Sequence, residues 1–98
     1  MNHSIALAQA ITMTSLYRSS IPEGMPVSET FELASVNTLL SQSGCTALRI
    51  YYGKKEDGTI HAILVGVNEK GEDITEGIIL EEGQRCPPNC PIDSQLNK

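Results

Sequence analysis

The residue types best suited to chemistry are two cysteines near the end of the chain, Cys86 and Cys90, which are separated by Pro-Pro-Asn. Thiolate and imidazole are the ligands that zinc prefers, so this pair could form a tetrahedral metal site together with Cys45 and His61. The two consecutive prolines weaken that interpretation, because they stiffen a turn that has to bend around the metal. The three intervening residues also differ from the spacing of thioredoxin-like redox pairs. A metal site, a disulfide and unpaired thiols in a tail all stay open.

The other chemistry-bearing residues stand alone in the sequence. Cys45 comes just after a predicted helix, where a single cysteine is most often a small buried apolar residue. His61 begins a predicted strand without a nucleophile or carboxylate beside it, which favours a surface position over a role as general base. There is no Gly-x-Ser-x-Gly elbow, and the acidic clusters lack the loop pattern of a calcium site. The sequence therefore indicates no catalytic residue and no cofactor.

A candidate binding surface lies on a predicted hairpin, where Arg49 and Tyr51 share one face beside small residues. Arginine and tyrosine are favoured at the centres of protein interfaces, so the two side chains could anchor a partner in a shallow groove. The alternative is a solvated arginine whose aliphatic stem covers the tyrosine ring, which is the more routine arrangement on protein surfaces.

The hairpin itself is the strongest local signal, because two β-rich runs, 47–53 and 59–68, are joined across Asp57 and Gly58. If these two residues occupy the central positions of a two-residue turn, Glu56 pairs with Thr59, and the whole register follows by counting outward. One face is then uniformly apolar and forms the predicted core: Leu48, Ile50, Tyr52, Ile63, Val65 and Val67. Arg49 and Tyr51 fall on the second face, and His61 lies opposite Lys54, away from both.

A helix is predicted for residues 4–20, with Ser4 as its N-cap, because the segment lacks Pro and Gly and is rich in good helix formers. No charged residue lies between His3 and Arg18, and the apolar residues cover most sides of the helix. Such a helix is usually buried on more than one side. In so small a chain the second side is expected to contact another subunit, with Leu7, Met13 and Tyr17 at the interface.

The remaining segments complete the predicted fold. Residues 27–32 alternate in polarity and favour an extended segment, with a helix from Ser28 as the alternative, whereas residues 33–40 follow helical spacing. A third strand is expected over 74–81, with a bulge near Gly77, and an irregular tail thereafter. The prediction is an α+β fold with two helices packed on a small antiparallel sheet of about three to four strands, centred on the 47–68 hairpin. Residues 1–85 form one domain, and residues 86–98 form an irregular Cys/Pro tail.

Composition limits the class of partner. With 98 residues, 40% hydrophobic and 19% charged, the chain is expected to fold as one domain that self-association can stabilise. A net charge of −5 opposes binding to nucleic acid or to anionic membranes, both of which require clustered Lys and Arg. No secretory signal or membrane-length apolar run is present, and an odd number of cysteines fits a reducing compartment. A cytoplasmic location is therefore predicted.

Three stretches together carry a resemblance: the strand Leu-Arg-Ile-Tyr-Tyr-Gly at 48–53, the strand at 61–67, and the tail Cys-Pro-Pro-Asn-Cys. In these the chain resembles a group of small uncharacterised bacterial proteins, and the likeness covers most of its length. The resemblance implies a bacterial cytoplasmic origin and carries no catalytic or binding residue over to this chain.

The weakness of every catalytic signal favours a non-enzymatic interaction module that self-associates, with an unidentified protein as a further partner. The alternative is a metal-binding or thiol-redox protein that uses Cys86 and Cys90, with Cys45 as a third participant. An enzyme built on Arg49, Tyr51 and His61 ranks last, because the predicted register puts His61 on the opposite face from the other two.

Overall fold

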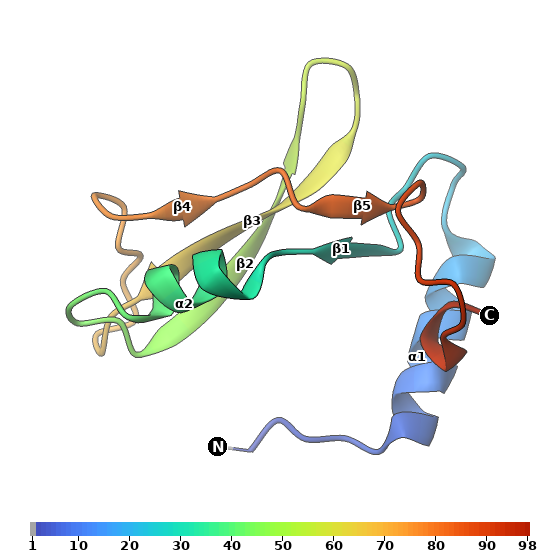
Figure 1. The fold of residues 1–98 in the computed structure, drawn as a ribbon, viewed down its shortest axis with the longest axis horizontal. Coiled ribbons are helices and arrows are strands. Elements are labelled where there is room, and N and C mark those ends of the chain that lie inside the picture. Colours follow the sequence, from blue (N-terminus) through green and yellow to red (C-terminus); the bar gives the residue numbers. More distant parts are fainter. Residues whose placement is uncertain (1) are drawn as a thin grey trace. The chain divides into compact units, whose positions relative to one another are not determined.

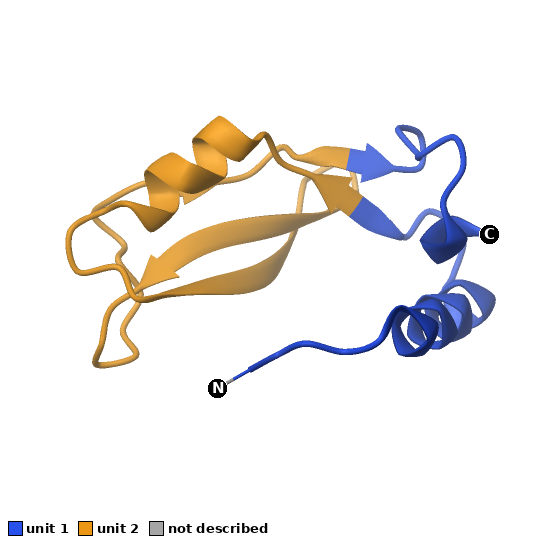
Figure 2. Ribbon diagram, turned by 60° about the horizontal axis from the view of Figure 1, so that its bottom comes forward, with its two compact units in different colours: residues 1–28, 85–98 blue, residues 29–84 orange. Residues whose placement is uncertain are grey.

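The computed structural model describes residues 2–98 and confirms an α+β fold with two helices and two small antiparallel sheets (Figure 1). In chain order the elements are α1 (Leu7–Ser20), β1 (Ser28–Thr30), α2 (Leu33–Leu40), β2 (Ala47–Lys54), β3 (Ile60–Val67), β4 (Ile79–Leu80), β5 (Gln84–Cys86) and the short 3-10 helix η1 (Gln95–Asn97). The chain divides into two compact units, residues 1–28 with 85–98 and residues 29–84 (Figure 2). The predicted tail thus belongs to the same unit as α1.

The larger unit is built on a three-stranded sheet of order β2-β3-β4. Its hairpin turn is one residue longer than predicted: the N–H of Gly58 donates to the carbonyl of Lys55, and the N–H of Lys55 donates to the carbonyl of Thr59. Gly58 has a φ of +93°, so the loop is a type I turn followed by a glycine in the left-handed region. The Asp57 carboxylate accepts hydrogen bonds from the N–H and hydroxyl of Thr59 and holds this turn closed.

The predicted register is therefore wrong by one residue. Lys54 pairs with Ile60, Arg49 with Val65, and Ala47 with Val67, in an unbroken ladder. Because side chains alternate between the faces of a strand, a shift of one residue moves every side chain of β2 to the other face relative to β3. The predicted core set thus mixes two faces. Of its members on β3, Val65 and Val67 are buried and Ile63 is half-buried, whereas Leu48, Ile50 and Tyr52 on β2 lie on the other face and are exposed.

Helix α2 covers one face of this sheet, where it contacts β3 and β4 (Figure 2). Leu39 is fully buried there, and the Gln42 amide, just beyond the helix, is held by two backbone groups. Its Nε2 donates to the carbonyl of Leu39 (2.8 Å), and its Oε1 accepts from the N–H of Ile78 (2.8 Å). A Cβ at Gly77 would lie 2.0 Å from Oε1, so only glycine leaves room for this amide.

The third strand is shorter than the predicted 74–81. Asp73 forms an isolated bridge with Val67, and β4 then pairs through Ile79 with Val65. Ile74 still donates to the carbonyl of Gly66 on β3. The residues after it leave the sheet, and there the N–H of Ile78 donates to the Gln42 side chain in place of a neighbouring strand. The bulge expected near Gly77 is thus an excursion of several residues.

In the smaller unit, α1 begins at Leu7 rather than at the predicted Ser4. The Gln9 side chain accepts a hydrogen bond from the N–H of Ala6 (2.9 Å) at the helix start. Arg18 donates to the carbonyls of Leu96 and Lys98, which ties η1 and the chain end to the helix.

The smaller, two-stranded sheet consists of β1 and β5. Of the two conformations considered for residues 27–32, the extended one is observed at 28–30. Strand β5 lies where an irregular tail is predicted. None of the helices described over residues 2–98 is both long and apolar enough to cross a membrane.

The packing of α2 provides a direct stability test. Leu39 is 0% exposed, and its neighbour Leu40 is 41% exposed. We expect Leu39→Ala to lower the free energy of unfolding by about 3 kcal/mol, because it removes buried methyl groups and leaves a cavity. Leu40→Ala, the matched control, should cost less than about 1 kcal/mol. Urea unfolding followed by circular dichroism measures both, and equal losses would show that α2 does not form the core.

Candidate functional site

The sheet face opposite α2 carries a polar cluster made of Arg49, Tyr51 and Asp73. Arg49 Nη1 lies 2.6 Å from Asp73 Oδ1, and the Tyr51 hydroxyl donates to Asp73 Oδ2. Both donors come from β2, whereas Asp73 lies on the far side of β3, opposite Val67. The two side chains therefore cross the central strand to reach the carboxylate, and the buried Val65 and Val67 lie on this same face.

Hydrogen bonding sets the charge state of this cluster. The Tyr51 hydroxyl and then the Arg49 guanidinium hold the pKa of the Asp73 carboxyl below its ordinary value. The interaction with the Asp73 carboxylate, and after it that with Tyr51, raises the pKa of Arg49. Both carboxylate oxygens of Asp73 are engaged, and the guanidinium also approaches the carbonyl of Gly71 at 3.4 Å. The cluster is therefore a clasp that fastens the segment before β4 to β2, rather than a general base poised to accept a proton.

A second charged cluster lies at the hairpin end of the same face. Lys55 Nζ is 3.3 Å from Glu81 and 3.0 Å from Glu82, and these carboxylates, Glu82 first, raise the pKa of Lys55. Glu82 has a φ of +64°, a backbone conformation that residues other than glycine rarely adopt. His61 Nδ1 is buried without a partner, and its distance of 3.9 Å from Glu81 Oε1 exceeds that of a hydrogen bond.

The predicted position of His61 on the hairpin is also wrong. His61 pairs with Gly53 rather than lying opposite Lys54, so it shares a face with Arg49 and Tyr51. This removes the geometric objection to grouping the three residues. Tyr51 and Arg49, however, direct their polar atoms to Asp73, and His61 lies beside Glu81.

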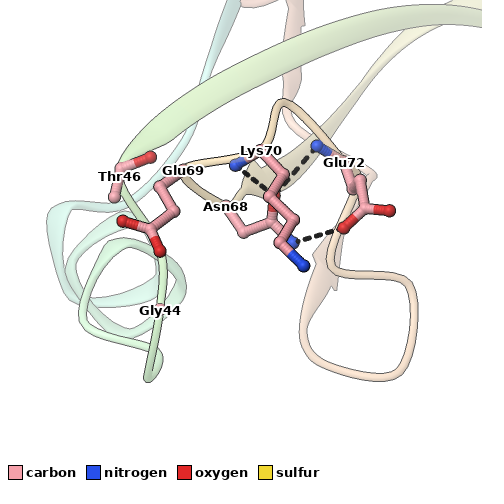
Figure 3. Close-up of a pocket in the computed structure, with 6 residues that line it drawn as sticks. All are labelled: Gly44, Thr46, Asn68, Glu69, Lys70 and Glu72. Carbon is pink, nitrogen blue, oxygen red and sulfur yellow. Dashed lines mark hydrogen bonds between the residues drawn. The ribbon is translucent and has the colours of Figure 1, made fainter.

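A shallow pocket of about 290 Å³ lies beside the turn between β3 and Asp73 (Figure 3). The Asn68 side chain lies in this pocket, and both the oxygen and the nitrogen of its amide form hydrogen bonds within the turn. Oδ1 accepts from the N–H groups of Lys70 (2.9 Å) and Glu72 (3.0 Å), and Nδ2 donates to the Glu72 carboxylate. The lining residues are Gly44, Thr46, Asn68, Glu69, Lys70 and Glu72. This amide shapes the turn and leaves at most one N–H of its Nδ2 for a ligand.

The three cysteines do not act as one group. Cys86 and Cys90 form a disulfide, the second of the three states considered from the sequence. Cys86 is buried and Cys90 is exposed. Cys45 is a free, half-buried thiol that donates weakly to the carbonyl of Ala47 (3.4 Å) and belongs to the larger unit. Over residues 2–98 no three or more His, Cys, Asp or Glu side chains gather as metal ligands would.

Helix α1 presents the predicted interface residues as exposed side chains. Leu7, Met13 and Tyr17 are all exposed, although the Tyr17 hydroxyl donates to the carbonyl of Pro26 (2.7 Å). The most exposed of the large apolar side chains in the helix is Leu16, at 64%, with Met13 at 63%. Leu16 was absent from the predicted interface, and its helical position next to Met13 and Tyr17 is the signal that could have identified it.

No protein family, curated protein or solved structure matches this chain. The function is therefore inferred from the geometry of the chain itself. Sequence reasoning selected Arg49 and Tyr51 but missed Asp73, which joins them. A carboxylate twenty-two residues from Tyr51 gives no local signal, because only the register of β3 with both of its neighbours brings them together.

The Asp73 clasp predicts a pH dependence. Because folding lowers the pKa of Asp73, the clasp stabilises the fold above the ordinary carboxyl pKa, and that stabilisation is lost as pH falls through the lowered value. We expect Asp73→Asn to be less stable than the native chain near pH 7. The difference between the two should shrink below about pH 4.

Thermal unfolding followed by circular dichroism between pH 7 and pH 2 measures this difference. Glu56→Gln, at an exposed position in the hairpin loop, is the matched control and should show no such convergence. A difference between Asp73→Asn and the native chain that stays constant over the whole range would contradict the clasp.

Proposed function

We propose that the chain is a non-enzymatic interaction module that self-associates through α1. The observation that carries this proposal is that α1, a helix of 14 residues, has no buried residue. In the smaller unit, residues 2–28 and 85–98, Cys86 alone is a buried residue. This unit therefore exposes apolar side chains without enclosing a core of its own.

The length of α1 strengthens the argument. An isolated helix shorter than about 12–15 residues is marginal in water, and longer ones in proteins draw most of their stability from packing. The half-buried residues of α1 are Ala10, Ile11, Thr14 and Arg18, which lie on the side that bonds to the chain end. Met13 and Leu16 point elsewhere and need a second surface.

The chemistry of that surface favours another copy of the same chain. α1 carries no charged side chain before Arg18, so it offers a partner apolar contact with no charge to complement. A two-fold dimer uses the same patch on both subunits, and an uncharged apolar patch meets itself without repulsion. A docking site for an unrelated charged protein would require charges that this helix lacks.

Substitutions in α1 test the proposal. We expect the native chain to run as more than a monomer in size-exclusion chromatography with light scattering. Met13→Glu and Leu16→Glu should each weaken association at least about 100-fold, because they place an unpaired carboxylate in an apolar contact.

Ser15→Glu is the matched control, since it adds the same charge at an exposed polar position of the same helix and should leave association intact. Circular dichroism establishes that each variant keeps its helix. A native chain that is monomeric at millimolar concentration would overturn the proposal, and so would oligomers that withstand both glutamates.

The disulfide favours a second candidate function in thiol exchange, because exposed Cys90 is open to attack. An external dithiol would transfer two electrons and two protons to the bridge, yielding the Cys86 and Cys90 thiols and an oxidised dithiol. This candidate is tied to the cellular compartment. A cytoplasmic location, predicted from the sequence, would make the bridge transient, whereas an oxidising compartment would make it permanent.

Alkylation with a maleimide separates the two cases. Purified under oxidising conditions, the chain should gain one adduct, at Cys45, and after reduction it should gain three. Rapid trapping inside the native cells should then give three adducts if the protein is kept reduced and one if the bridge is permanent. A single adduct in cells would contradict both the cytoplasmic location and the exchange function.

A further inference from the structure

Strand β2 is the open edge of the three-stranded sheet. It pairs with β3 on one side, and no strand described over residues 2–98 pairs with its other side. Along its eight residues the register is unbroken, without the bulge or proline that often blunts such an edge. An edge of this kind offers a row of unpaired backbone donors and acceptors.

The ladder shows which backbone groups are free. Lys55 donates to Thr59 in the same register as the pairs of β2 with β3, so the residues with odd numbers form the hydrogen-bonded pairs. Leu48, Ile50 and Tyr52 must then direct their N–H and C=O groups away from β3. Their side chains share the face that α2 covers over β3 and β4 but leaves open over β2, and all three are exposed.

We propose that β2 pairs antiparallel with β2 of a second copy, about a two-fold axis at Ile50, which joins two three-stranded sheets into one of six strands. This rests on the proposed self-association and assigns it a second surface, distinct from α1. The order of residues along β2 indicates that its pairing partner is the same strand of a second copy.

With Ile50 opposite Ile50 of the partner subunit, Leu48 lies opposite Tyr52 of the partner subunit, and the reverse pair completes the row. These are the positions whose backbone groups point outward, so each of the three can exchange hydrogen bonds with its opposite residue. Their side chains form one apolar row across both copies, in which an aliphatic residue meets an aromatic one. A register shifted by one residue would pair apolar with polar faces.

The charges agree with this register. Arg49 lies opposite the partner's Tyr51, and Lys54 lies opposite the partner's Thr46, so no two like charges stand directly opposite each other. The Arg49 guanidinium is already bonded to Asp73 within its own subunit, and an arginine stem over a tyrosine ring is a favourable cross-strand contact. An acidic or basic peptide on this edge would find no matching row of charges.

A matched pair of substitutions tests the edge. Ile50 on β2 and Ile79 on β4 are 49% and 50% exposed, so a lysine should be tolerated equally by the isolated fold at either position. We expect Ile50→Lys to weaken association at least about 10-fold, because two lysines would meet at the two-fold axis, and Ile79→Lys to leave it unchanged. Sedimentation equilibrium measures the association constants. An equal effect of the two lysines, or none from Ile50→Lys, would overturn the proposal.

Cross-linking tests the register without a charge change, in a Cys45→Ser background that removes the free thiol. Residues facing each other in a hydrogen-bonded pair have Cα atoms about 5.5 Å apart, which a disulfide can span. Ile50→Cys should therefore form a covalent dimer under mild oxidation. Leu48→Cys should not, because its counterpart lies about four residues along the strand, roughly 13 Å away. Equal cross-linking at 48 and 50 would overturn the register.

The two surfaces are separable by experiment. If Met13→Glu dissociates the oligomer and Ile50→Lys does not, the α1 proposal holds and the β2 pairing fails. If Ile50→Lys alone dissociates it, the β2 pairing holds and the α1 proposal fails. If each variant leaves a smaller oligomer built on the other surface, both are supported, and a native chain that never associates overturns both.

Discussion

The turn between β2 and β3 is the constraint on which the larger unit depends. Its three-residue loop is closed by the Gly58 N–H on the Lys55 carbonyl and by Asp57 on Thr59. A two-residue loop over the same sequence would pair each residue of β2 with the next position on β3. Because side chains alternate along a strand, that single step decides which residues enclose the sheet and which remain exposed.

Two features follow from this register. On one face, Arg49 and Tyr51 reach across Val65 and Val67 to Asp73, so polar side chains cover buried apolar ones without a second helix. On the other face, α2 covers β3 and β4 and leaves the apolar row of β2 open. The exposed row and the outward backbone groups belong to the same residues, which is why the edge is suited to pairing.

The smaller unit contains a helix with few packing partners, since no residue of α1 is buried. The short 3-10 helix η1 and the Arg18 hydrogen bonds hold the chain end against one side of α1. They leave the apolar side chains of the other side exposed. An open strand edge and a partly covered helix are both surfaces that association can stabilise, and neither contains a reactive constellation.

The sequence by itself determined the element types of the first helix, the short helix at 33–40 and the hairpin, and it left residues 27–32 open between an extended segment and a helix. These are local properties. The turn length was misjudged because Asp-Gly suits both two-residue and three-residue loops, and the choice depends on hydrogen bonds to Lys55 and Thr59.

Only the tertiary structure decided the partners of distant residues. Asp73 meets Arg49 and Tyr51 through a strand that lies between them, and Gln42 holds the segment near Gly77 from the far end of a helix. No local pattern encodes such contacts, because they arise when separate segments share a face. The sequence thus specified what each segment becomes, and packing specified which side chains it exposes.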